Sequence, residues 1–584
     1  MANLTRTLLL CACLLTSGVA RSQDRKPAKD RPLDTSYLRL HAQTRGFMLG
    51  RPVKPQPTPD GKAVLFLRAQ ARVPRMALYE YDLTTAKTRE LASADSILGG
   101  NEEKLSAEEK ARRERMRVSV GGFTDYQLSD DGALVLLALS GKLYAVNRAS
   151  GAVEVLPAGN GTILDPKFSP NARYVSYVRD HDVCVLDRQT RKESAVTSGG
   201  SERLTHGLPE FVAEEEMHRH TGYWWSPDSR RIAFEESDTS AVETWFVADP
   251  AHPEQKPHPS FYPRPGKANA KVRLGVVPLS GGNVCWIDWN RERYPYLARV
   301  NWEEHGPLAL QVQTRDQKEL VLLKADPESG RTTPLLSETD PAWVNLQLGT
   351  PRWLTQDRGF IWSAGGSDGP RLEHRGADGK LLAVLCPAEA GFQGVVDVDS
   401  GSGEVIYQAS QDPTETRLFR VSLDSQKPVI LTRGPGIHNA VFGKGSSVYA
   451  LESASSHMPR TTVHSLDGGL LATLPSVAED PPFLPNSWTA KVGDGPGYYA
   501  VVVRPRDFDT NKRYPVIVSV YGGPGFRMVQ AAMHRLLLNQ WLADQGFVVV
   551  SLDGRGTPGR SHDWERAISK HFGSVPLDDQ VAGL

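Results

Sequence analysis

Three consecutive glutamates, Glu214, Glu215 and Glu216, have a type and spacing that suit a binding role. A primary ammonium group carries a full positive charge and three hydrogen-bond donors, and two neighbouring carboxylates can satisfy both. Crowding such acids together costs free energy until a cation arrives. A run of glutamates is, however, more often a solvated helix face. Residue types alone leave both interpretations open.

The pattern Gly-x-Ser-x-Gly occurs at residues 365–369, centred on Ser367. Such a motif presents a nucleophilic serine when it forms a sharp turn between a strand and a helix. Here the strand-like stretch 360–363 is followed by Pro370 and by a second short strand-like stretch, 371–374. This order predicts a hairpin turn in which Ser367 is structural rather than catalytic.

Two glycine-rich turns follow apolar, strand-like runs near the end of the chain. Tyr521 opens the first turn, at 521–525, and the second spans residues 553–559. Ligands of α/β sheets bind at the carboxyl ends of parallel strands, where glycine lets the backbone approach closely. A phenol donor aimed at developing negative charge is worth on the order of 3 kcal/mol. Taken alone, a tyrosine at this place is more often simply packed at a strand end.

Metal and cofactor chemistry finds little support in the sequence. His218 and His220 stand near the glutamates, but no third ligand follows at a recognisable spacing. No phosphate-binding glycine loop with a following lysine occurs. We therefore expect no metal and no cofactor. Two of the five cysteines, Cys11 and Cys13, lie within the first 20 residues. The other three, Cys184, Cys285 and Cys386, are odd in number and widely spaced, which predicts no disulfide framework and at least one free thiol.

Residues 51–480 repeat one unit, a polar turn followed by alternating apolar residues. The clearest copies are 168–176 and 225–234, and weaker ones recur at intervals of roughly 40 to 70 residues. Strand repeats of this length predict an all-β propeller of about eight blades. A long array of β-sandwiches is the alternative, but it would leave many strand edges unpaired.

Two helical insertions interrupt these strands. Residues 101–117 are charged on nearly every face, with acids early and bases late as the helix dipole prefers, which predicts a solvated arm. Residues 209–221 carry the three glutamates and form the second insertion.

Residues 481–584 have a different pattern, which begins after a proline-rich, linker-like run. Apolar strands at 499–503, 514–520 and 547–552 alternate with a helix predicted over 528–546. Strands that alternate with helices predict a doubly wound α/β sheet.

The first 20 residues have the features of a signal peptide: Arg6, an apolar run over 8–15, and small residues at 18–20. The apolar run is too short to span a bilayer. A degenerate lipoprotein signal at Cys13 is the alternative. We therefore expect a secreted or periplasmic protein, in which residues 21–50 form an N-terminal segment that packs on the α/β unit.

The balance of charge disfavours polyanionic partners. Lysine plus arginine and aspartate plus glutamate both number 68 in the 584 residues. No bulk field therefore attracts nucleic acid or an anionic membrane, and we expect neither as a partner.

The chain resembles the prolyl oligopeptidase family of serine peptidases, and specifically its dipeptidyl peptidase IV branch. The segments that carry the resemblance are 211–217, 222–228, the two glycine-rich turns, and 578–584. It covers nearly the whole chain after residue 20 and implies a β-propeller joined to an α/β-hydrolase domain. Ser561 departs from the pattern, because relatives often carry glycine in that stretch.

The resemblance implies roles for individual residues. Glu215 and Glu216 would capture the free α-amino group of a peptide, and Tyr521 would help to stabilise the oxyanion. An arginine from the propeller would contact the substrate carbonyl, but no local motif marks it. The implied activity is release of N-terminal dipeptides, X-Pro or X-Ala, from peptides with a free N-terminus, and a homodimer is compatible with it. An oligopeptidase or acylaminoacyl peptidase of the same family and a non-catalytic propeller interaction module with a vestigial hydrolase domain are the alternatives.

The resemblance also sets an expectation for the catalytic triad. In the family, the serine, aspartate and histidine follow in that order, and the serine elbow comes after a helix that here would begin near Leu577. The sequence ends at Leu584. We therefore expect the 584 residues to be truncated before the triad, catalytically inert, and less stable at the C-terminal end.

Overall fold

The computed structural model describes residues 33, 35–365 and 369–584. The predicted signal peptide, the alternative lipoprotein cysteine and Ser367 lie outside these residues. In the described part of the chain, no helix is both long and apolar enough to cross a bilayer.

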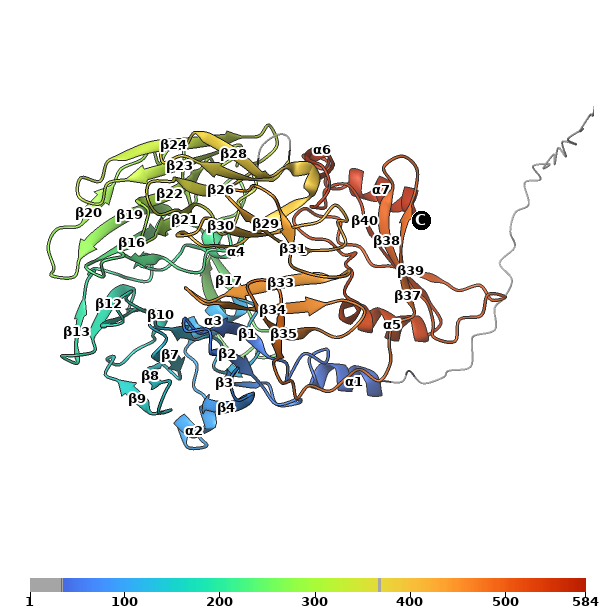
Figure 1. Cartoon of the computed structure of the whole chain (residues 1–584), viewed down its shortest axis with the longest axis horizontal. Helices are drawn as coiled ribbons and strands as arrows, with labels where there is room; N and C mark the ends of the chain where they lie inside the picture. Colours follow the sequence, from blue (N-terminus) through green and yellow to red (C-terminus); the bar gives the residue numbers. More distant parts are fainter. Residues whose placement is uncertain (1–32, 34, 366–368) are drawn as a thin grey trace, which may run out of the picture.

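Eight sheets, each built on four antiparallel strands, form a propeller (Figure 1), which confirms the predicted fold. Blade 1 contains β1 (Val53–Pro57), β2 (Ala63–Arg68), β3 (Arg75–Asp82) and β4 (Lys87–Ala92), with β5 (Gly121–Gly122) parallel to β3. Blade 2 contains β6 (Gln127–Leu128), β7 (Leu134–Leu139), β8 (Lys142–Asn147) and β9 (Val153–Leu156). Blade 3 contains β10 (Leu164–Phe168), β11 (Tyr174–Arg179), β12 (Asp182–Asp187) and β13 (Lys192–Ala195).

Blade 4 departs from this plan, because its first strand is split. The two pieces, β14 (Leu204–His206) and β15 (Tyr223–Trp225), both pair with β16 (Arg231–Asp238), and the insertion with the glutamates leaves between them. The blade continues with β19 (Lys271–Pro278) and β20 (Cys285–Ile287). A separate hairpin, β17 (Thr244–Val247) with β18 (His258–Phe261), connects β16 to β19.

The remaining blades are regular. Blade 5 contains β21 (Tyr296–Trp302), β22 (Leu308–Gln313), β23 (Glu319–Ala325) and β24 (Thr332–Thr339). Blade 6 contains β25 (Arg352–Trp353), β26 (Phe360–Ala364), β27 (Arg371–Arg375) and β28 (Leu381–Cys386). Blade 7, which follows the 3-10 turn η1 (Ala388–Ala390), contains β29 (Phe392–Val398), β30 (Glu404–Ala409), β31 (Arg417–Ser422) and β32 (Val429–Ile430). Blade 8 contains β33 (Ile437–Phe442), β34 (Val448–Ala454), β35 (Arg460–Ser465) and β36 (Leu470–Thr473).

The repeated turns seen in the sequence connect the first two paired strands of the early blades. In each, a hydroxyl donates to a carboxylate or amide oxygen two residues later and accepts from a backbone N–H five residues later. The four hydroxyls are those of Thr58, Ser129, Ser169 and Ser226. The residue after the Asp or Asn has a positive φ, 72° at Gly132 and 52° at Ala172. One local turn therefore starts each of these blades, as the sequence pattern predicts.

The ring closes between the first and last blades. Val64 and Phe66 of β2 share a buried apolar cluster with Val448 of β34 and Val463 of β35. Apolar packing of this kind removes strand faces from water without any exchange of strands between the blades.

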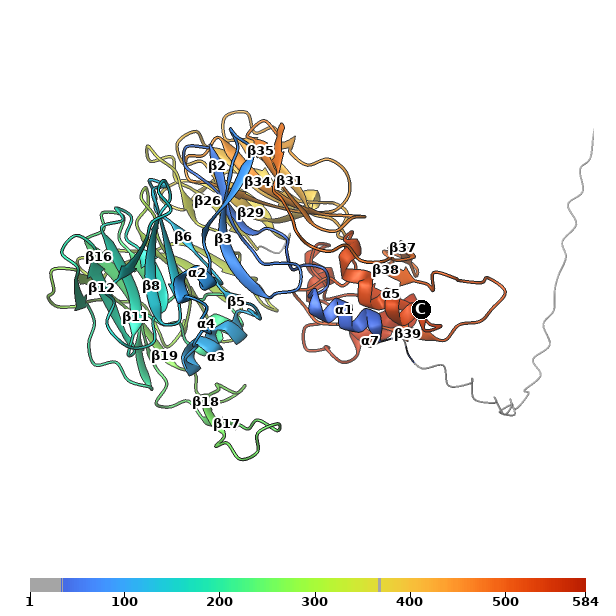
Figure 2. The same ribbon diagram turned by 90° about the horizontal axis from the view of Figure 1, so that it is seen from below.

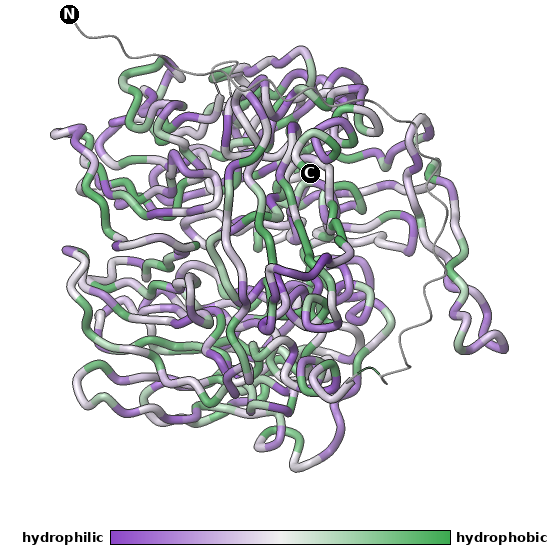
Figure 3. Tube along the Cα trace, turned by 90° about the vertical axis from the view of Figure 1, so that its right-hand side faces the viewer, coloured by the Kyte–Doolittle hydropathy of each residue, from purple (hydrophilic) through white to green (hydrophobic). Residues whose placement is uncertain are grey.

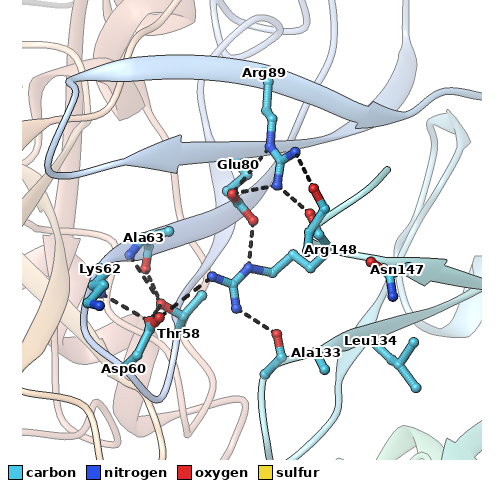
Figure 4. A network of polar contacts seen from close by, with 12 residues as sticks. Thr58, Asp60, Lys62, Ala63, Glu80, Arg89, Ala133, Leu134, Asn147 and Arg148 are labelled. Carbon is cyan, nitrogen blue, oxygen red and sulfur yellow. Dashed lines mark hydrogen bonds and ion pairs between the residues drawn. The ribbon is translucent and has the colours of Figure 1, made fainter. Parts of the chain in front are cut away.

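Buried charges also join neighbouring blades. Glu80 on β3 accepts hydrogen bonds from Arg89 Nη2 at 2.9 Å and, across the blade boundary, from Arg148 Nε at 2.7 Å (Figure 4). Arg148 also donates to the carbonyl oxygen of Gly132 at 2.6 Å. Blades 1 and 2 are therefore linked by polar contacts as well as by their apolar faces.

The C-terminal unit is a four-stranded sheet in the order β37-β38-β40-β39. Its strands are β37 (Ser487–Val492), β38 (Tyr498–Val503), β39 (Val516–Val518) and β40 (Val548–Asp553). Only β39 and β40 are parallel, while β38 is antiparallel to both β37 and β40. Figure 3 looks onto this end of the molecule and shows hydrophobic strands near the C-terminus. Helices α5 (Leu537–Asp544), α6 (His562–Arg566) and α7 (Val575–Gly583) complete the unit.

The helix predicted over residues 528–546 is shorter in the structure. Its helical part is the 3-10 turn η2 (Met533–Leu536) followed by α5. The preceding residues bond elsewhere: Met528 and Val529 donate their backbone N–H groups to the Asp553 carboxylate at 2.8 and 3.0 Å. The Ala531 N–H donates to the carbonyl oxygen of Thr414 in the propeller at 2.8 Å. Tertiary partners therefore replace the first helical turns.

Several contacts besides that of Ala531 join the propeller unit to the C-terminal unit, including those of Arg527 with Pro413 and of Met533 with Ser455. Helix α1 (Ser36–Gln43) lies beside α5 (Figure 2), where the Tyr37 hydroxyl donates to the carbonyl oxygen of Leu537 at 3.3 Å. On the other side, α6 contacts the segment after β24 through Asp340. The Asp340 Oδ2 atom lies 2.5 Å from His562 Nε2 and accepts from Arg566 Nε at 3.2 Å.

Candidate functional site

The glutamates lie on α4 (Phe211–Glu215), a helix of five residues in the insertion of blade 4. Such a short helix is not stable by itself and depends on its ends being satisfied. Glu210 is its N-cap, because its carboxylate accepts from the backbone N–H groups of Val212 at 2.8 Å and Ala213 at 2.7 Å. Glu216 is the C-cap residue.

The three glutamates have different surroundings. The Glu214 side chain is 7% exposed and its Oε2 atom accepts from Arg115 Nη1 at 2.7 Å. The Glu215 side chain is 23% exposed, and its Oε2 atom lies 3.8 Å from Arg117 Nη2. Glu216 is exposed. Glu214 is therefore neutralised in a close, buried ion pair, whereas Glu215 makes only a longer ion pair with Arg117 and, like Glu216, remains accessible to a cation.

The first insertion provides the arginines that face these acids. Its helix, α3 (Ala107–Arg115), lies beside α4 (Figure 2). The prediction of a solvated arm is wrong, because Arg113 is buried and donates to Glu109 at 2.9 Å and to Glu103 at 2.7 Å. The insertion packs against α4 because the buried carboxylate of Glu214 needs a nearby cation, and Arg115 at the end of α3 provides it. Sequence reasoning missed this pairing, since Arg115 and Glu214 are 99 residues apart.

Tyr521 lies in the other unit, after the carboxyl end of β39. Its side chain is 54% exposed, and its ring meets that of Phe526 edge-on with centroids 5.4 Å apart. Gly522 and Gly525 adopt left-handed backbone with φ of 71° and 78°, as a tight turn requires. Among the described residues, no recorded interaction links Tyr521 to Glu215 or Glu216. The structure therefore places the three predicted residues on two separate elements.

The second glycine-rich turn is tied to the last helix. Asp579 on α7 is fully buried and accepts from the Arg555 backbone N–H at 2.6 Å and from Arg555 Nη2 at 2.6 Å. The Tyr498 hydroxyl donates to the same carboxylate at 3.1 Å. Ser561, the residue that departs from the family pattern, caps α6 by accepting from the Trp564 N–H at 3.2 Å.

The segment around the Gly-x-Ser-x-Gly pattern joins β26 to β27. These strands are antiparallel neighbours in blade 6, with Ala364 opposite Arg371, so the predicted hairpin is confirmed. Ser367 itself lies outside the described residues.

The described residues contain no group of three or more His, Cys, Asp or Glu side chains that could hold a metal ion. His218 is exposed, and His220 is half-buried on the same insertion. Cys184, Cys285 and Cys386 are free thiols, and burial raises the pKa of Cys184 to about 11.

Glu210 should make the stability of the propeller depend on pH. Burial, followed by the nearby charge of Glu235, raises the pKa of Glu210 to about 7, well above its value of about 4.3 in an unfolded chain. Between these values the folded state holds the proton that the unfolded state has lost, so stability falls as pH rises. The free energy of unfolding of Glu210→Gln, relative to the parent, should therefore rise by about 1–3 kcal/mol between pH 5 and 8. Urea unfolding at several pH values measures it, and a difference that is flat with pH would contradict it.

The fold is a β-propeller joined to an α/β sheet of the hydrolase type. Residues 131–460 match the family described as the dipeptidyl peptidase IV (DPP IV) N-terminal region, and residues 535–584 match the prolyl oligopeptidase family. The first match covers more than half of the chain. The chain belongs to the prolyl oligopeptidase family of serine peptidases, in its dipeptidyl peptidase IV branch.

Curated relatives agree with this assignment. The chain is 26% identical over 477 residues to a probable dipeptidyl-aminopeptidase B of Emericella nidulans, covering 72% of this chain and 51% of the relative. It is 24% identical over 591 residues to dipeptidyl peptidase 8 of Mus musculus, covering 82% and 66%. The chain therefore spans about half to two thirds of the length of these relatives.

A solved structure supports the fold. The crystal structure of Porphyromonas gingivalis dipeptidyl peptidase 4 matches with a TM-score of 0.77 and 21% sequence identity, covering 95% of this chain and 78% of that one. At this identity the likeness concerns the fold alone.

Proposed function

We propose that this chain belongs to a serine exopeptidase that releases N-terminal dipeptides, and that it supplies the site for the substrate amine. The observation that supports the proposal best is the difference in surroundings among the three glutamates at α4. Arg115 neutralises Glu214, whereas the carboxylates of Glu215 and Glu216 stay accessible. The names of the relatives, dipeptidyl peptidase and dipeptidyl-aminopeptidase, support the same activity.

The carboxylates of Glu215 and Glu216 would explain a preference for peptides with a free N-terminus. A free α-ammonium group would donate to both carboxylates, which makes charge-assisted hydrogen bonds. A peptide extended or acetylated at that end has a neutral amide in place of the ammonium group and could not make these charge-assisted bonds, so it would bind less well. Tyr521, at the carboxyl end of β39, would donate its hydroxyl hydrogen to the oxyanion of the reacting carbonyl.

Arg117 is our candidate for the arginine that contacts the substrate carbonyl. Its side chain is 78% exposed and its guanidinium lies 3.8 Å from Glu215, beside the proposed amine site. A guanidinium held there has free donors for a carbonyl oxygen. Arg115 is less suited, because its guanidinium already bonds to Glu214.

Several finer properties are part of the proposal. We expect cleavage after X-Pro or X-Ala, and assays of matched dipeptide substrates test this specificity. We also expect a secreted or periplasmic location after loss of residues 1–20, and the N-terminal sequence of the purified protein tests that loss. A homodimer, which light scattering tests, is compatible with the family. We also propose that the 584 residues alone do not hydrolyse peptides, because their Gly-x-Ser-x-Gly pattern lies between β26 and β27 of the propeller.

Calorimetric titration of the 584-residue protein with alanyl-proline amide and with its N-acetyl form tests the proposal. We expect the free amine to bind about 10- to 100-fold more tightly, the range of one charge-assisted hydrogen bond. Equal affinities would favour the interaction module, and tighter binding of the acetylated form would favour an acylaminoacyl peptidase. The same samples, given alanyl-proline p-nitroanilide, should release no p-nitroaniline above background; release would refute the inertness of this chain.

A further inference from the structure

Glu235 lies at the gap in the split strand of blade 4 and holds both ends of the insertion. It is a fully buried residue of β16, between Phe234, which pairs with β15, and Glu236, which pairs with β14. Its backbone N–H donates to the carbonyl oxygen of Gly222 at 2.7 Å, and its carbonyl oxygen accepts from the Gly207 N–H at 2.8 Å. The insertion therefore starts and ends beside this one residue.

The side chain of Glu235 holds the insertion from inside. Its Oε1 atom accepts from the backbone N–H of Glu210, the N-cap residue of α4, at 3.0 Å. Its Oε2 atom accepts from Arg219 Nη2, beyond the other end of α4, at 2.5 Å. One carboxylate thus fixes the residue before α4 and a residue after it.

Arg219 extends this contact to the next blade. Its guanidinium also donates to the carbonyl oxygens of Thr221 at 2.8 Å and Leu297 at 3.0 Å, and Leu297 belongs to β21. Its backbone N–H donates to the carbonyl oxygen of Ala213 within α4, at 2.9 Å. The side chains of both partners are almost completely buried, with 4% exposed for Arg219 and none for Glu235.

The positions of Glu215 and Glu216 depend on the contacts of Glu210 and Arg219 with Glu235. The Glu214 N–H bonds to the carbonyl oxygen of Glu210, and the Glu216 N–H bonds to that of Val212. A displacement of Glu210 would therefore move the whole helix and the carboxylates on it. A buried ion pair is poor at adding stability compared with apolar packing, but it fixes geometry, because both partners must meet in one arrangement.

We propose that Glu235 is a positioning residue which, through Glu210 and Arg219, holds Glu215 and Glu216 where they can share a free α-ammonium group. The inference rests on the proposed function for its ligand, whereas the anchoring of α4 stands on the contacts alone. Glu235 itself does not touch the peptide.

The test compares Glu235→Gln with a matched control, Glu373→Gln, in the 584-residue protein. Glu373 is also a fully buried glutamate of a propeller strand, and its carboxylate pairs with Arg371 and Arg375 at 2.6 Å each. The control therefore removes the same charge from an equally buried site in blade 6. Two properties are measured: hydrogen exchange of the amides in residues 210–219, and the ratio of affinities for alanyl-proline amide and its N-acetyl form.

We expect Glu235→Gln to speed amide exchange in residues 210–219 by roughly fivefold or more, because the buried Arg219 loses its charged partner, while β19 stays protected. The affinity ratio should fall by a similar factor, and Glu373→Gln should change neither. Unchanged exchange, or faster exchange with an unchanged ratio, would overturn the role of Glu235. A parent protein that binds both peptides equally would instead overturn the proposed function and, with it, the ligand of this inference. Should Glu235→Gln not fold, Arg219→Lys keeps the positive charge but loses the guanidinium bonds to Glu235 and Leu297, and it is judged by the same two measurements.

Discussion

Replacing Glu215 and Glu216 together by glutamine should weaken binding of alanyl-proline amide by about 100-fold, and leave binding of the acetylated peptide unchanged. Each carboxylate would make a charge-assisted hydrogen bond to the ammonium group, worth roughly 1.5–3 kcal/mol. The total should stay below the sum of two such bonds, because the site is partly open to water and neighbouring acids are coupled. Calorimetric titration of parent and variant provides both affinities.

A control variant separates this effect from a change in overall charge. Glu304→Gln with Glu328→Gln removes the same two charges from the propeller surface, where the side chains are 65% and 70% exposed. This variant should bind the free amine like the parent. If it weakened binding as much as the α4 variant, long-range charge rather than a local amine site would explain the result.

The second large effect is expected at the contact between the two units. Asp340→Ala should destabilise this contact by about 3–5 kcal/mol, the typical loss when one partner of a buried ion pair is removed. The Asp340 side chain is 1% exposed and lies against His562 and Arg566. Its other oxygen accepts from the backbone N–H groups of Ala342 and Trp343 at 2.7 and 3.1 Å.

Limited proteolysis and scanning calorimetry measure this loss. We expect cleavage between the units to become faster and the single unfolding transition to broaden or split, because the propeller and the α/β sheet have separate cores. Asp378→Ala is the control, since Asp378 forms a surface ion pair with the exposed Lys380, from whose backbone N–H it also accepts at 3.1 Å, and exposed pairs contribute about 1 kcal/mol or less. Equal behaviour of the two variants would contradict a role for Asp340 in holding the units together.

The parts of the fold that depend on local chemistry could be predicted from the sequence. The Ser-Pro-Asp turn at Ser226 and its copies are closed by contacts within five residues, so they mark the first four blades directly. Strands β38 and β40 of the α/β sheet are runs of mostly apolar residues, so they too are recognisable from the sequence, whereas the more polar and exposed β37 is not.

Long-range partners could not be predicted in this way. Residues 528–532 have helix-forming side chains, but Asp553 and Thr414 take their backbone N–H groups. The same applies to the site. The charge of α3 was evident, yet its contact with Glu214 depends on how blades bring two distant insertions together. The role of Glu235 could not be predicted, because a single glutamate in a strand gives no sign that it lies opposite the break between β14 and β15.

The contact between α1 and α5 sets an order of events during synthesis. Tyr37 and its partner Leu537 are 500 residues apart, so at about 5–20 residues per second the ribosome needs roughly 25–100 s to deliver the second after the first. Throughout that interval all eight blades emerge and can close, and Phe47 and Phe483 reach Tyr37 before Leu537 does. The contact of α1 with α5 therefore forms only after nearly all of the described chain has left the ribosome, and until then a chaperone would meet the part of α1 that α5 later covers.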